Sequence, residues 1–362
     1  MKAPAPIEVP VGIPGRKCRV LVGPDLLART GELARDSGLG GTCAVITDEN
    51  VGPLHGAAVR NSLEAAGIRA VLLTVPAGER SKCLATAEDV CDRMIAAGLD
   101  RGSFVVALGG GVVGDLAGFV AAIYQRGIPL VQIPTTIVAQ VDSSIGGKTG
   151  VNARAGKNLI GAFHQPCLVL ADTNTLATLP DREYREGFAE VIKHAAIRDA
   201  ALLEALDPAT PREHLAPLIA RNIAIKAAIV AADEHEQTGQ RALLNFGHTI
   251  AHAIENVAGY GRFLHGEAVS LGLAAALEIS QSKAGLSGPE AARVRAKLAA
   301  FGLPLTLAAD LSADDLLAAA RRDKKFTGGR VRYVVIPRLG EAFVAEDVTE
   351  DDLRAAIDSL RA

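Results

Sequence analysis

Short β-type runs alternate with amphipathic segments through the first half of the chain, and this alternation is the strongest constraint on its fold. Strands are expected at Arg19–Val22, Cys43–Thr47, Val71–Val75, Phe104–Leu108, Leu130–Ile133 and Leu168–Ala171. Helical patterns lie between several of these runs, at Asp25–Asp36, Leu54–Ala66 and Lys82–Ala97. Strands that alternate with helices predict a largely parallel sheet with helices on both faces.

The second half of the chain has a different pattern. Almost no β-type run occurs from Pro180 to Ala308, where successive helices are expected at Glu186–Ile197, Pro211–Ala232, Leu243–Ala258 and Glu267–Lys283. A strand at Val331–Ile336 and a closing helix around Glu350–Leu360 follow. We therefore predict two domains, an α/β domain over residues 1–178 and a mainly helical domain over residues 179–362.

Charge and composition exclude several classes of protein. The 362 residues carry 38 Lys and Arg against 41 Asp and Glu, so the net charge of −3 gives no overall attraction to nucleic acid. Any anion site must be local. Five scattered cysteines without a CxxC pair indicate a reducing compartment, and the start MKAPAPIEVPVG lacks the apolar core of a signal peptide. We expect a cytoplasmic protein.

One apolar stretch, Phe104–Ile123, has the length of a membrane span. It contains five glycines and one charged residue, Asp115. Four of the glycines fall between Gly109 and Gly114, which a lipid-exposed helix would tolerate poorly. The stretch therefore predicts a buried strand, a tight turn and a buried helix.

The glycine-rich turn in this stretch points to a nucleotide. Residues 109–115 read GGGVVGD directly after a strand and before a helix, which satisfies the GxGxxG pattern. Such glycines let the backbone approach a pyrophosphate at a helix N-terminus. No acidic residue follows at the usual distance for a ribose, but Asp48 and Asn50 lie at the end of the second expected strand. The pattern indicates a dinucleotide in an unusual arrangement.

A second segment is suited to binding phosphate. Residues 142–152 read DSSIGGKTGVN, and Gly156, Lys157 and Asn158 follow. Glycines, hydroxyls and lysines in a loop between strands bind phosphate through backbone N–H groups and ammonium charge. The GGKT portion does not fit the GxxxxGK[ST] spacing, so a nucleotide triphosphatase is not indicated.

Six of the eight histidines lie after residue 193, which indicates a metal site in the second half. His248 and His252 are four residues apart and share a helix face, so both could be ligands. A carboxylate would complete the set, and the sequence leaves three candidates open, namely Glu190, Glu255 and Glu267. Two histidines and one carboxylate leave positions open for substrate, as in catalytic zinc sites. The absence of HExxH excludes a zincin protease.

Taken together, these segments resemble the 3-dehydroquinate synthase family over nearly the whole chain. The matching blocks are PAGERSK (76–82), GGGVVGDLAGFVA (109–121), QIPTT (132–136), QVDSSIGGKTGVN (140–152), GKNLIGAFHQP (156–166), TLPDREYREGFAEVIKH (178–194), RALLNFGHTIAHAIE (241–255), HGEAV (265–269) and DKK (323–325). The resemblance implies a Rossmann-like nucleotide-binding domain, then a helical metal-binding domain, with the active site between them.

The resemblance also implies an activity. A member of this family would convert 3-deoxy-D-arabino-heptulosonate 7-phosphate to 3-dehydroquinate and phosphate, as a phosphate-eliminating lyase of the shikimate pathway. It would use bound NAD as a catalytic hydride carrier and one Zn²⁺, for which Co²⁺ can substitute. It would act as a homodimer, with Arg126 reaching the neighbouring subunit's site.

Individual site residues follow by motif position. The resemblance implies three metal ligands, Glu190, His248 and His265. It implies NAD contacts from Asp48, Asn50, Gly78, Glu79, Lys82, Gly111, Val112, Gly114, Asp115, Thr135, Thr136, Asp142, Lys148, Lys157, Thr175, Leu176 and Thr178. The catalytic residues would be Lys148, Lys193, Arg241, Asn245 and His252, and further substrate contacts would come from Arg126, Asp142, Lys157, Asn158, Lys226 and one of Lys324 or Lys325.

Some alternatives stay open on the sequence. Gln237 replaces a usual glutamate, with Glu236 beside it as a substitute, and Ala251 replaces a frequent glycine. A related sugar-phosphate cyclase such as aminodehydroquinate synthase, a metal-dependent polyol dehydrogenase and a non-catalytic dinucleotide-binding regulator are the rival interpretations. The intact DSSIGGKTGVN and GKNLIGAF blocks favour 3-dehydroquinate synthase over the first of these.

Overall fold

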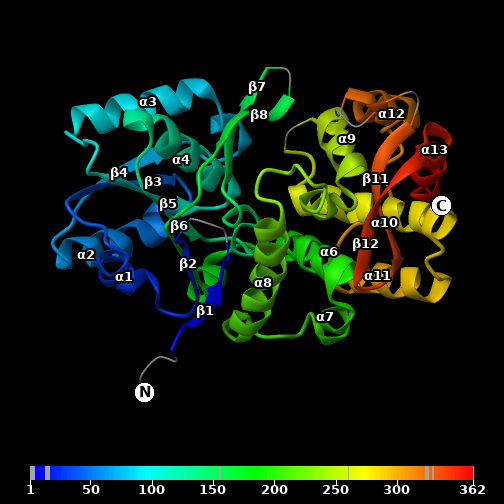
Figure 1. Cartoon of the computed structure of the whole chain (residues 1–362), viewed down its shortest axis with the longest axis horizontal. Coiled ribbons are helices and arrows are strands. Elements are labelled where there is room, and N and C mark those ends of the chain that lie inside the picture. The colour runs from blue at the N-terminus through cyan, green and yellow to red at the C-terminus, as the bar shows by residue number, and fades with distance from the viewer. Residues whose placement is uncertain are drawn as a thin grey trace. The chain divides into compact units, whose positions relative to one another are not determined.

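The computed structural model describes residues 5–12, 17–154, 156–259, 261–322, 326–327 and 330–361 (Figure 1). The chain forms two compact units. Unit 1 comprises residues 1–180 and 210–234, and unit 2 comprises residues 181–209 and 235–362. The first crossing from one unit to the other lies after residue 180, close to the domain boundary expected after residue 178. Residues 210–234, expected in the helical domain, belong instead to unit 1.

Unit 1 is built on a seven-stranded sheet in the order β1-β2-β9-β6-β5-β3-β4. The strands are β1 (Ile7–Pro10), β2 (Arg19–Gly23), β3 (Thr42–Asp48), β4 (Arg69–Val75), β5 (Phe104–Gly109), β6 (Leu130–Pro134) and β9 (Leu168–Asp172). All neighbouring pairs are parallel except β1 with β2. The six predicted strands are all present, and the predicted α/β fold class is confirmed. The antiparallel edge strand β1 was not predicted.

Helices cover both faces of this sheet. One face packs against α1 (Thr30–Asp36) and α2 (Ala57–Ala65), and the other against α3 (Leu84–Ala96) and α4 (Gly111–Ile123) (Figure 1). Successive side chains of a strand point to opposite faces. In β3, Cys43 and Val45 therefore join the α1–α2 core, whereas Ala44 and Ile46 join the α3–α4 core. The glycine-rich stretch is a buried strand, a turn and a helix, as predicted.

The strand order creates a topological switch point at the carboxyl ends of β3 and β5. The chain leaves β3, forms β4 on one side, and then returns to form β5 on the other side of β3. Loops after β3 and β5 therefore diverge at this point, and ligands of open α/β sheets bind at the carboxyl ends of such strands. Asp48 ends β3 and Gly109 ends β5. The fold thus brings the two predicted nucleotide-binding segments to neighbouring strand ends.

Residues 148–153 and 156–163 form a pair of strands, here called the hairpin, which corrects the prediction of a loop there. The strands β7 (Lys148–Ala153) and β8 (Gly156–Phe163) pair antiparallel. Gly150 and Gly161 face one another across the pair, and a Cβ on Gly161 would lie 2.3 Å from the Thr149 carbonyl oxygen. Glycines permit this approach because they have no Cβ, and they also weaken the β-type pattern by which a strand is recognised.

Unit 2 is mainly helical. Its helices are α5 (Asp181–Glu186), α6 (Phe188–Arg198), α7 (Ala200–Ala205), α9 (His248–Ala258), α10 (His265–Ala284), α11 (Gly288–Ala300), α12 (Ala313–Arg322) and α13 (Glu350–Ser359), while α8 (Ala216–Ala232) belongs to unit 1. The described residues between 180 and 308 contain no strand, as predicted.

A small antiparallel sheet of β10 (Phe326–Thr327), β11 (Arg330–Arg338) and β12 (Glu341–Thr349) precedes α13. Only β11 was predicted, since β12 is largely exposed and rich in acidic residues. No helix in the described part of the chain has the length and hydropathy needed to cross a membrane.

The start of α9 packs closely on α10. Gly247 precedes α9 in the left-handed region at φ 80°, and a Cβ on Gly272 in α10 would lie 2.1 Å from the Gly247 carbonyl oxygen. A methyl group at position 272 must push the two helices apart. We expect Gly272→Ala to lower the free energy of unfolding by about 1–3 kcal/mol, measured by urea denaturation. Gly288→Ala is the control, because a Cβ there meets nothing closer than 3.8 Å. Equal stability of the two variants would contradict this packing argument.

Candidate active site

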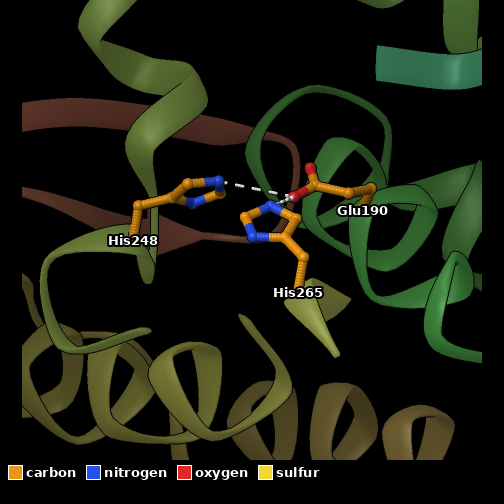
Figure 2. A group of neighbouring side chains, drawn as sticks. All are labelled: Glu190, His248 and His265. Carbon is orange, nitrogen blue, oxygen red and sulfur yellow. Dashed lines mark ion pairs between the residues drawn. The ribbon is translucent and has the colours of Figure 1, made fainter. Parts of the chain in front are cut away.

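Three side chains from separate helices of unit 2 converge in one cluster (Figure 2). Glu190 lies in α6, and His248 and His265 are the first residues of α9 and α10. The Nε2 atoms of His248 and His265 lie 3.4 Å and 3.3 Å from Glu190 Oε1. Glu190 is fully buried, His248 is almost so and His265 is half-buried. These are the three residues that the family resemblance implied as metal ligands.

The other candidate ligands lie elsewhere. His252 follows His248 by one helical turn, and the two rings meet edge to face at 5.4 Å between centroids. Glu255 Oε1 lies 3.5 Å from His265 Nδ1, on the side of the ring away from Glu190. The Glu267 carboxylate pairs with Arg182 at 2.7 Å. The structure therefore separates candidates that helical spacing alone left equivalent.

Both histidine rings have an outer partner that orients them. The Nδ1 atom of His248 lies 3.1 Å from the Phe246 carbonyl oxygen, and Glu255 occupies the same position behind His265. Metal-ligating histidines ordinarily donate their second N–H to a carbonyl or carboxylate, which fixes the tautomer and the direction of the free nitrogen. Here both Nε2 atoms are directed toward Glu190. The arrangement is that of ligands prepared for a shared cation.

The electrostatics of the cluster depend on its depth. Burial acts to raise the pKa of Glu190, but the Lys193 ammonium beside it and His248 outweigh burial and hold that pKa well below its usual range. Burial, together with Lys193, lowers the pKa of His248. Burial also acts to lower the pKa of His265, but Glu190 and Glu255 outweigh burial and hold that pKa well above its usual range. Because metals bind an ionised carboxylate and a neutral imidazole, Glu190 and His248 are in the binding forms and His265 would release a proton on binding.

The residues fit a catalytic divalent metal. Two imidazole nitrogens and one carboxylate oxygen are a usual donor set for Zn²⁺ or Co²⁺, and three protein ligands leave a position open for substrate. The Lys193 ammonium pairs with Glu190 Oε2, whereas Oε1 faces the Nε2 atoms of both histidines. A cation bound among these three atoms would be shared by Glu190 Oε1 and the two histidines.

We expect Glu255→Gln to weaken metal binding by roughly 10–100-fold, because the variant loses the negative charge that orients and polarises His265. Competition between the protein and a chromophoric chelator measures the affinity. Glu278→Gln is a matched control, because Glu278 lies on the same helix as His265 but pairs with Arg295 at the surface. An unchanged affinity in Glu255→Gln would contradict the orienting role.

The remaining candidate residues of unit 2 lie within a few residues of the cluster's side chains in the sequence. Lys193 follows Glu190 by one helical turn and is fully buried. Arg241 and Asn245 begin and end a short 3-10 helix (Arg241–Asn245) directly before α9, and Arg241 is buried. Asn245 Nδ2 donates to Glu236 Oε1 at 3.4 Å, which places the substitute carboxylate of this loop next to a predicted substrate contact.

Most of the predicted NAD contacts of unit 1 lie at the carboxyl ends of the strands of its large sheet. Asp48 Oδ1 accepts hydrogen bonds from the backbone N–H groups of Asn50 and Val51 at 2.9 Å and 2.8 Å, which shapes the loop after β3. Helix α4 begins next to Gly110 at the end of β5 and can direct its first N–H groups at an anion. A Cβ on Gly114 would lie 2.9 Å from Gln132 Oε1, so this glycine allows α4 to pack on β6.

A buried ion pair lies beside this helix. Lys82 follows the 3-10 helix Glu79–Ser81, and its Nζ lies 2.5 Å from Asp115 Oδ2 in the second turn of α4. Burial raises the pKa of Asp115, whereas the Lys82 ammonium lowers it. Gly78, at φ 92°, starts the turn that carries Glu79 and Lys82. The glycine-rich turn and the loop of residues 78–82 are thereby joined.

The other predicted NAD contacts follow β6 and β9. Thr135 and Thr136 come after β6, and Thr175, Leu176 and Thr178 lie in the 3-10 helix Thr173–Thr178 after β9. Gln140 Nε2 links the two segments, because it donates to the Pro134 and Asp172 carbonyl oxygens at 3.1 Å and 3.0 Å. The carboxyl ends of five neighbouring strands, β9, β6, β5, β3 and β4, are thus followed by predicted cofactor residues.

Several predicted substrate contacts also belong to unit 1. Lys226 of α8 pairs with Asp142 Oδ1 at 2.8 Å and donates to the Asp142 carbonyl oxygen at 2.5 Å. Lys148, Lys157 and Asn158 lie on the β7–β8 hairpin. Arg126 ends the 3-10 helix Tyr124–Arg126 at φ 70°. Lys324 and Lys325 lie outside the described residues.

Comparison with known proteins decides the family. Residues 72–186 match the family described as "3-dehydroquinate synthase N-terminal", and residues 187–326 match "3-dehydroquinate synthase C-terminal". A 3-dehydroquinate synthase from Caulobacter vibrioides is 48% identical over 359 residues, covering 96% of this chain and 97% of the relative. The chain belongs to the 3-dehydroquinate synthase family. The predicted family and its enzyme class, EC 4.2.3.4, are confirmed.

Solved structures of other cyclases have the same fold as this 3-dehydroquinate synthase family member. A 2-epi-5-epi-valiolone synthase from Streptomyces hygroscopicus, solved with NAD⁺ and Zn²⁺, matches with a TM-score of 0.86 and 30% identity over 99% of both chains. A 2-deoxy-scyllo-inosose synthase, solved with carbaglucose-6-phosphate, NAD⁺ and Co²⁺, matches with a TM-score of 0.89 and 24% identity, covering 98% of this chain and all of the other. The second likeness shows the fold alone.

Some site features could not be found from the sequence. Glu186 is buried and accepts a hydrogen bond from the Gly266 N–H at 2.5 Å, so it fixes the start of the helix that carries His265. Burial raises the pKa of Glu186 to about 7, against the opposing effect of His265. Eighty residues separate Glu186 from Gly266. No local pattern marks such a contact, because it arises only when α5 and α10 pack together.

Proposed function

We propose that this chain converts 3-deoxy-D-arabino-heptulosonate 7-phosphate to 3-dehydroquinate and phosphate, with NAD and one divalent metal, Zn²⁺ or Co²⁺, as cofactors. The observation that carries the proposal is the convergence of Glu190, His248 and His265 in a chain that matches 3-dehydroquinate synthases over nearly its whole length. The overall reaction is a transient oxidation at C5, β-elimination of phosphate, re-reduction, ring opening and an intramolecular aldol closure.

The unit 2 cluster is proposed to hold the metal, which would lower the pKa of a substrate hydroxyl that it coordinates. Lys193 is proposed to contact the same part of the substrate, because it lies one helical turn after the proposed ligand Glu190. Lys193 keeps Glu190 ionised, as the lowered pKa of Glu190 indicates. Removal of the Lys193 ammonium would leave the carboxylate buried with one fewer cation.

The carboxyl ends of the unit 1 strands are proposed to hold NAD, which would accept a hydride and return it within one turnover. The N-terminus of α4 and the Gly110–Gly111 backbone would face the pyrophosphate, and the loop after β3 would face a ribose. Asp48 supports NAD rather than NADP, because its charge would repel a 2′-phosphate. The carboxyl ends of β3 and β5 are adjacent in the sheet. The loops that follow these two strands can therefore contact both halves of a dinucleotide.

The substrate anions are proposed to be bound by the lysine, arginine, asparagine and histidine side chains that the family resemblance implies. Lys226 and Arg241 would take the carboxylate, for which the planar guanidinium offers paired donors. Lys148, Asn245, His252, Arg126 and one of Lys324 or Lys325 would take the phosphate. A homodimer, with Arg126 serving the partner's site, and a cytoplasmic location complete the proposal. Light scattering of the purified protein tests the dimer.

Phosphate release tests the reaction. With metal bound and NAD at less than one equivalent per substrate, we expect many phosphates per enzyme and no accumulation of NADH absorbance. A polyol dehydrogenase would instead accumulate NADH in step with substrate consumed and release no phosphate, and a regulator would do neither. Supplying the amino analogue of the heptulosonate phosphate separates the alternative cyclase, because preferred turnover of that analogue would identify an aminodehydroquinate synthase.

A further inference from the structure

Asn152 lies where the cofactor loop meets the hairpin. This side chain near the end of β7 is not one of the proposed cofactor, substrate or metal contacts. The backbone of Asn152 pairs with Cys83 in an isolated parallel bridge, and its N–H donates to the Lys82 carbonyl oxygen at 2.8 Å. Residues 78–82, here called the cofactor loop, are thereby attached to the hairpin by its backbone.

The Asn152 side chain uses both ends of its amide. Its Nδ2 donates to Glu79 Oε1 at 2.8 Å, on the cofactor loop. Its Oδ1 accepts from the Asn158 N–H at 3.0 Å, on the far strand of the hairpin. One side chain thus links a proposed NAD contact to a proposed substrate contact.

The Asn152 amide restrains both linked residues. Asn158 has φ 56°, in the left-handed region that asparagine adopts more readily than most L residues, and the hydrogen bond from its N–H to Asn152 stabilises this conformation. Glu79 carries a flexible carboxylate on a single turn of 3-10 helix, and the Asn152 amide orients that carboxylate. A residue that presents a donor and an acceptor at this length must be an amide.

We propose that Asn152 is a positioning residue that couples the NAD site to the substrate site. It positions the Glu79 carboxylate on one side and the Lys157–Asn158 backbone of β8 on the other, so that a change at either site alters the geometry of the other. The inference rests on the proposed function, since it takes residues 78–82 as NAD contacts and residues 157–158 as substrate contacts. Asn152 itself touches neither ligand and acts through these neighbours.

The test replaces the amide by a carboxylate in the full-length, metal-loaded protein. Asn152→Asp keeps the acceptor for Asn158 but loses the donor and places two carboxylates side by side. We expect the Kd for NAD, measured by calorimetry, to rise roughly 10–100-fold, because a hydrogen bond to a charged group is replaced by repulsion. The KM for the heptulosonate phosphate is expected to rise less. Asn61→Asp on the exposed face of α2 adds the same charge and is the control.

A second substitution shows whether the Glu79 contact is responsible. Glu79→Gln in the Asn152→Asp background restores a donor–acceptor pair with its direction reversed. We expect the double variant to bind NAD more tightly than Asn152→Asp alone, whereas two independent losses would make it weaker. Additive losses, or an NAD affinity in Asn152→Asp within twofold of the wild type, would overturn the proposal.

Failure of the proposed reaction can be distinguished from failure of the proposed coupling. If the wild type binds NAD but releases no phosphate, the proposed reaction fails while the NAD affinities still decide the coupling. If the wild type binds no NAD, both proposals fail. Should Asn152→Asp unfold, the single Glu79→Gln and the conservative Asn152→Gln provide the comparison. The longer amide then has to retain NAD affinity better than Asn152→Ala, and equal affinities of these two variants would count against positioning.

Discussion

Replacement of His265 by alanine is expected to strip the metal from the protein and to reduce phosphate release by about a hundredfold or more. His265 supplies one of three protein ligands, and loss of a single outer-sphere partner already costs roughly 10–100-fold in comparable sites. Its Nε2 lies 3.3 Å from Glu190 Oε1, so removal of the ring leaves the cluster with only two of its three proposed ligands. Metal content after dialysis, measured by mass spectrometry, and a phosphate assay give the two readouts.

The matched variant is His252→Ala, one helical turn beyond His248. This variant should keep its metal and lose turnover, because His252 lies outside the group of ligand atoms that come within 4.8 Å of one another. Chelation of the wild type should abolish activity, and Zn²⁺ or Co²⁺ should restore it. Loss of metal in His252→Ala together with its retention in His248→Ala would reverse the ligand assignment.

The sheet could be predicted because its strands carry a local signal. Each parallel strand of unit 1 is a short, continuous apolar run between helical patterns, and burial on both faces requires such a run. The β7–β8 hairpin carries no such signal, because Gly150 and Gly161 interrupt the apolar pattern where they face one another. Strand β12 was missed for a related reason, since its outward face is acidic and only part of it is buried.

The composition of the site was less accessible than the fold. Spacing alone predicts that His248 and His252 share a helix face. Which other side chains lie near these histidines depends on how the helices pack, and spacing does not show that. In the structure, Glu255 contacts Nδ1 of His265, and Glu267 forms an ion pair with Arg182. Neither contact has a local sequence signature. Helix α8 illustrates the same limit. Its sequence predicts a helix, but not that the helix packs in unit 1 and pairs Lys226 with Asp142.

Replacement of Lys82 by methionine is expected to destabilise the protein and to abolish tight NAD binding. The Lys82 side chain is 5% exposed and that of Asp115 is 19% exposed, with 2.5 Å between Nζ and Oδ2. Methionine fills a similar volume but leaves the carboxylate without its cation. Removal of one partner of a buried pair costs about 3–5 kcal/mol of unfolding free energy. Because Asp115 is partly exposed, we expect a loss of about 3 kcal/mol here. Urea unfolding measures this loss.

The double variant Lys82→Met, Asp115→Asn separates the cost of the unpaired charge from the loss of the ligand contact. A neutral amide is far less costly to bury than a carboxylate, so the double variant should regain most of the lost free energy of unfolding. Its NAD affinity should stay low, because both proposed contacts of the cofactor are altered. If Lys82→Met is as stable as the wild type, the pair contributes nothing to the fold. If the double variant also binds NAD as the wild type does, Lys82 and Asp115 form a structural pair outside the cofactor site.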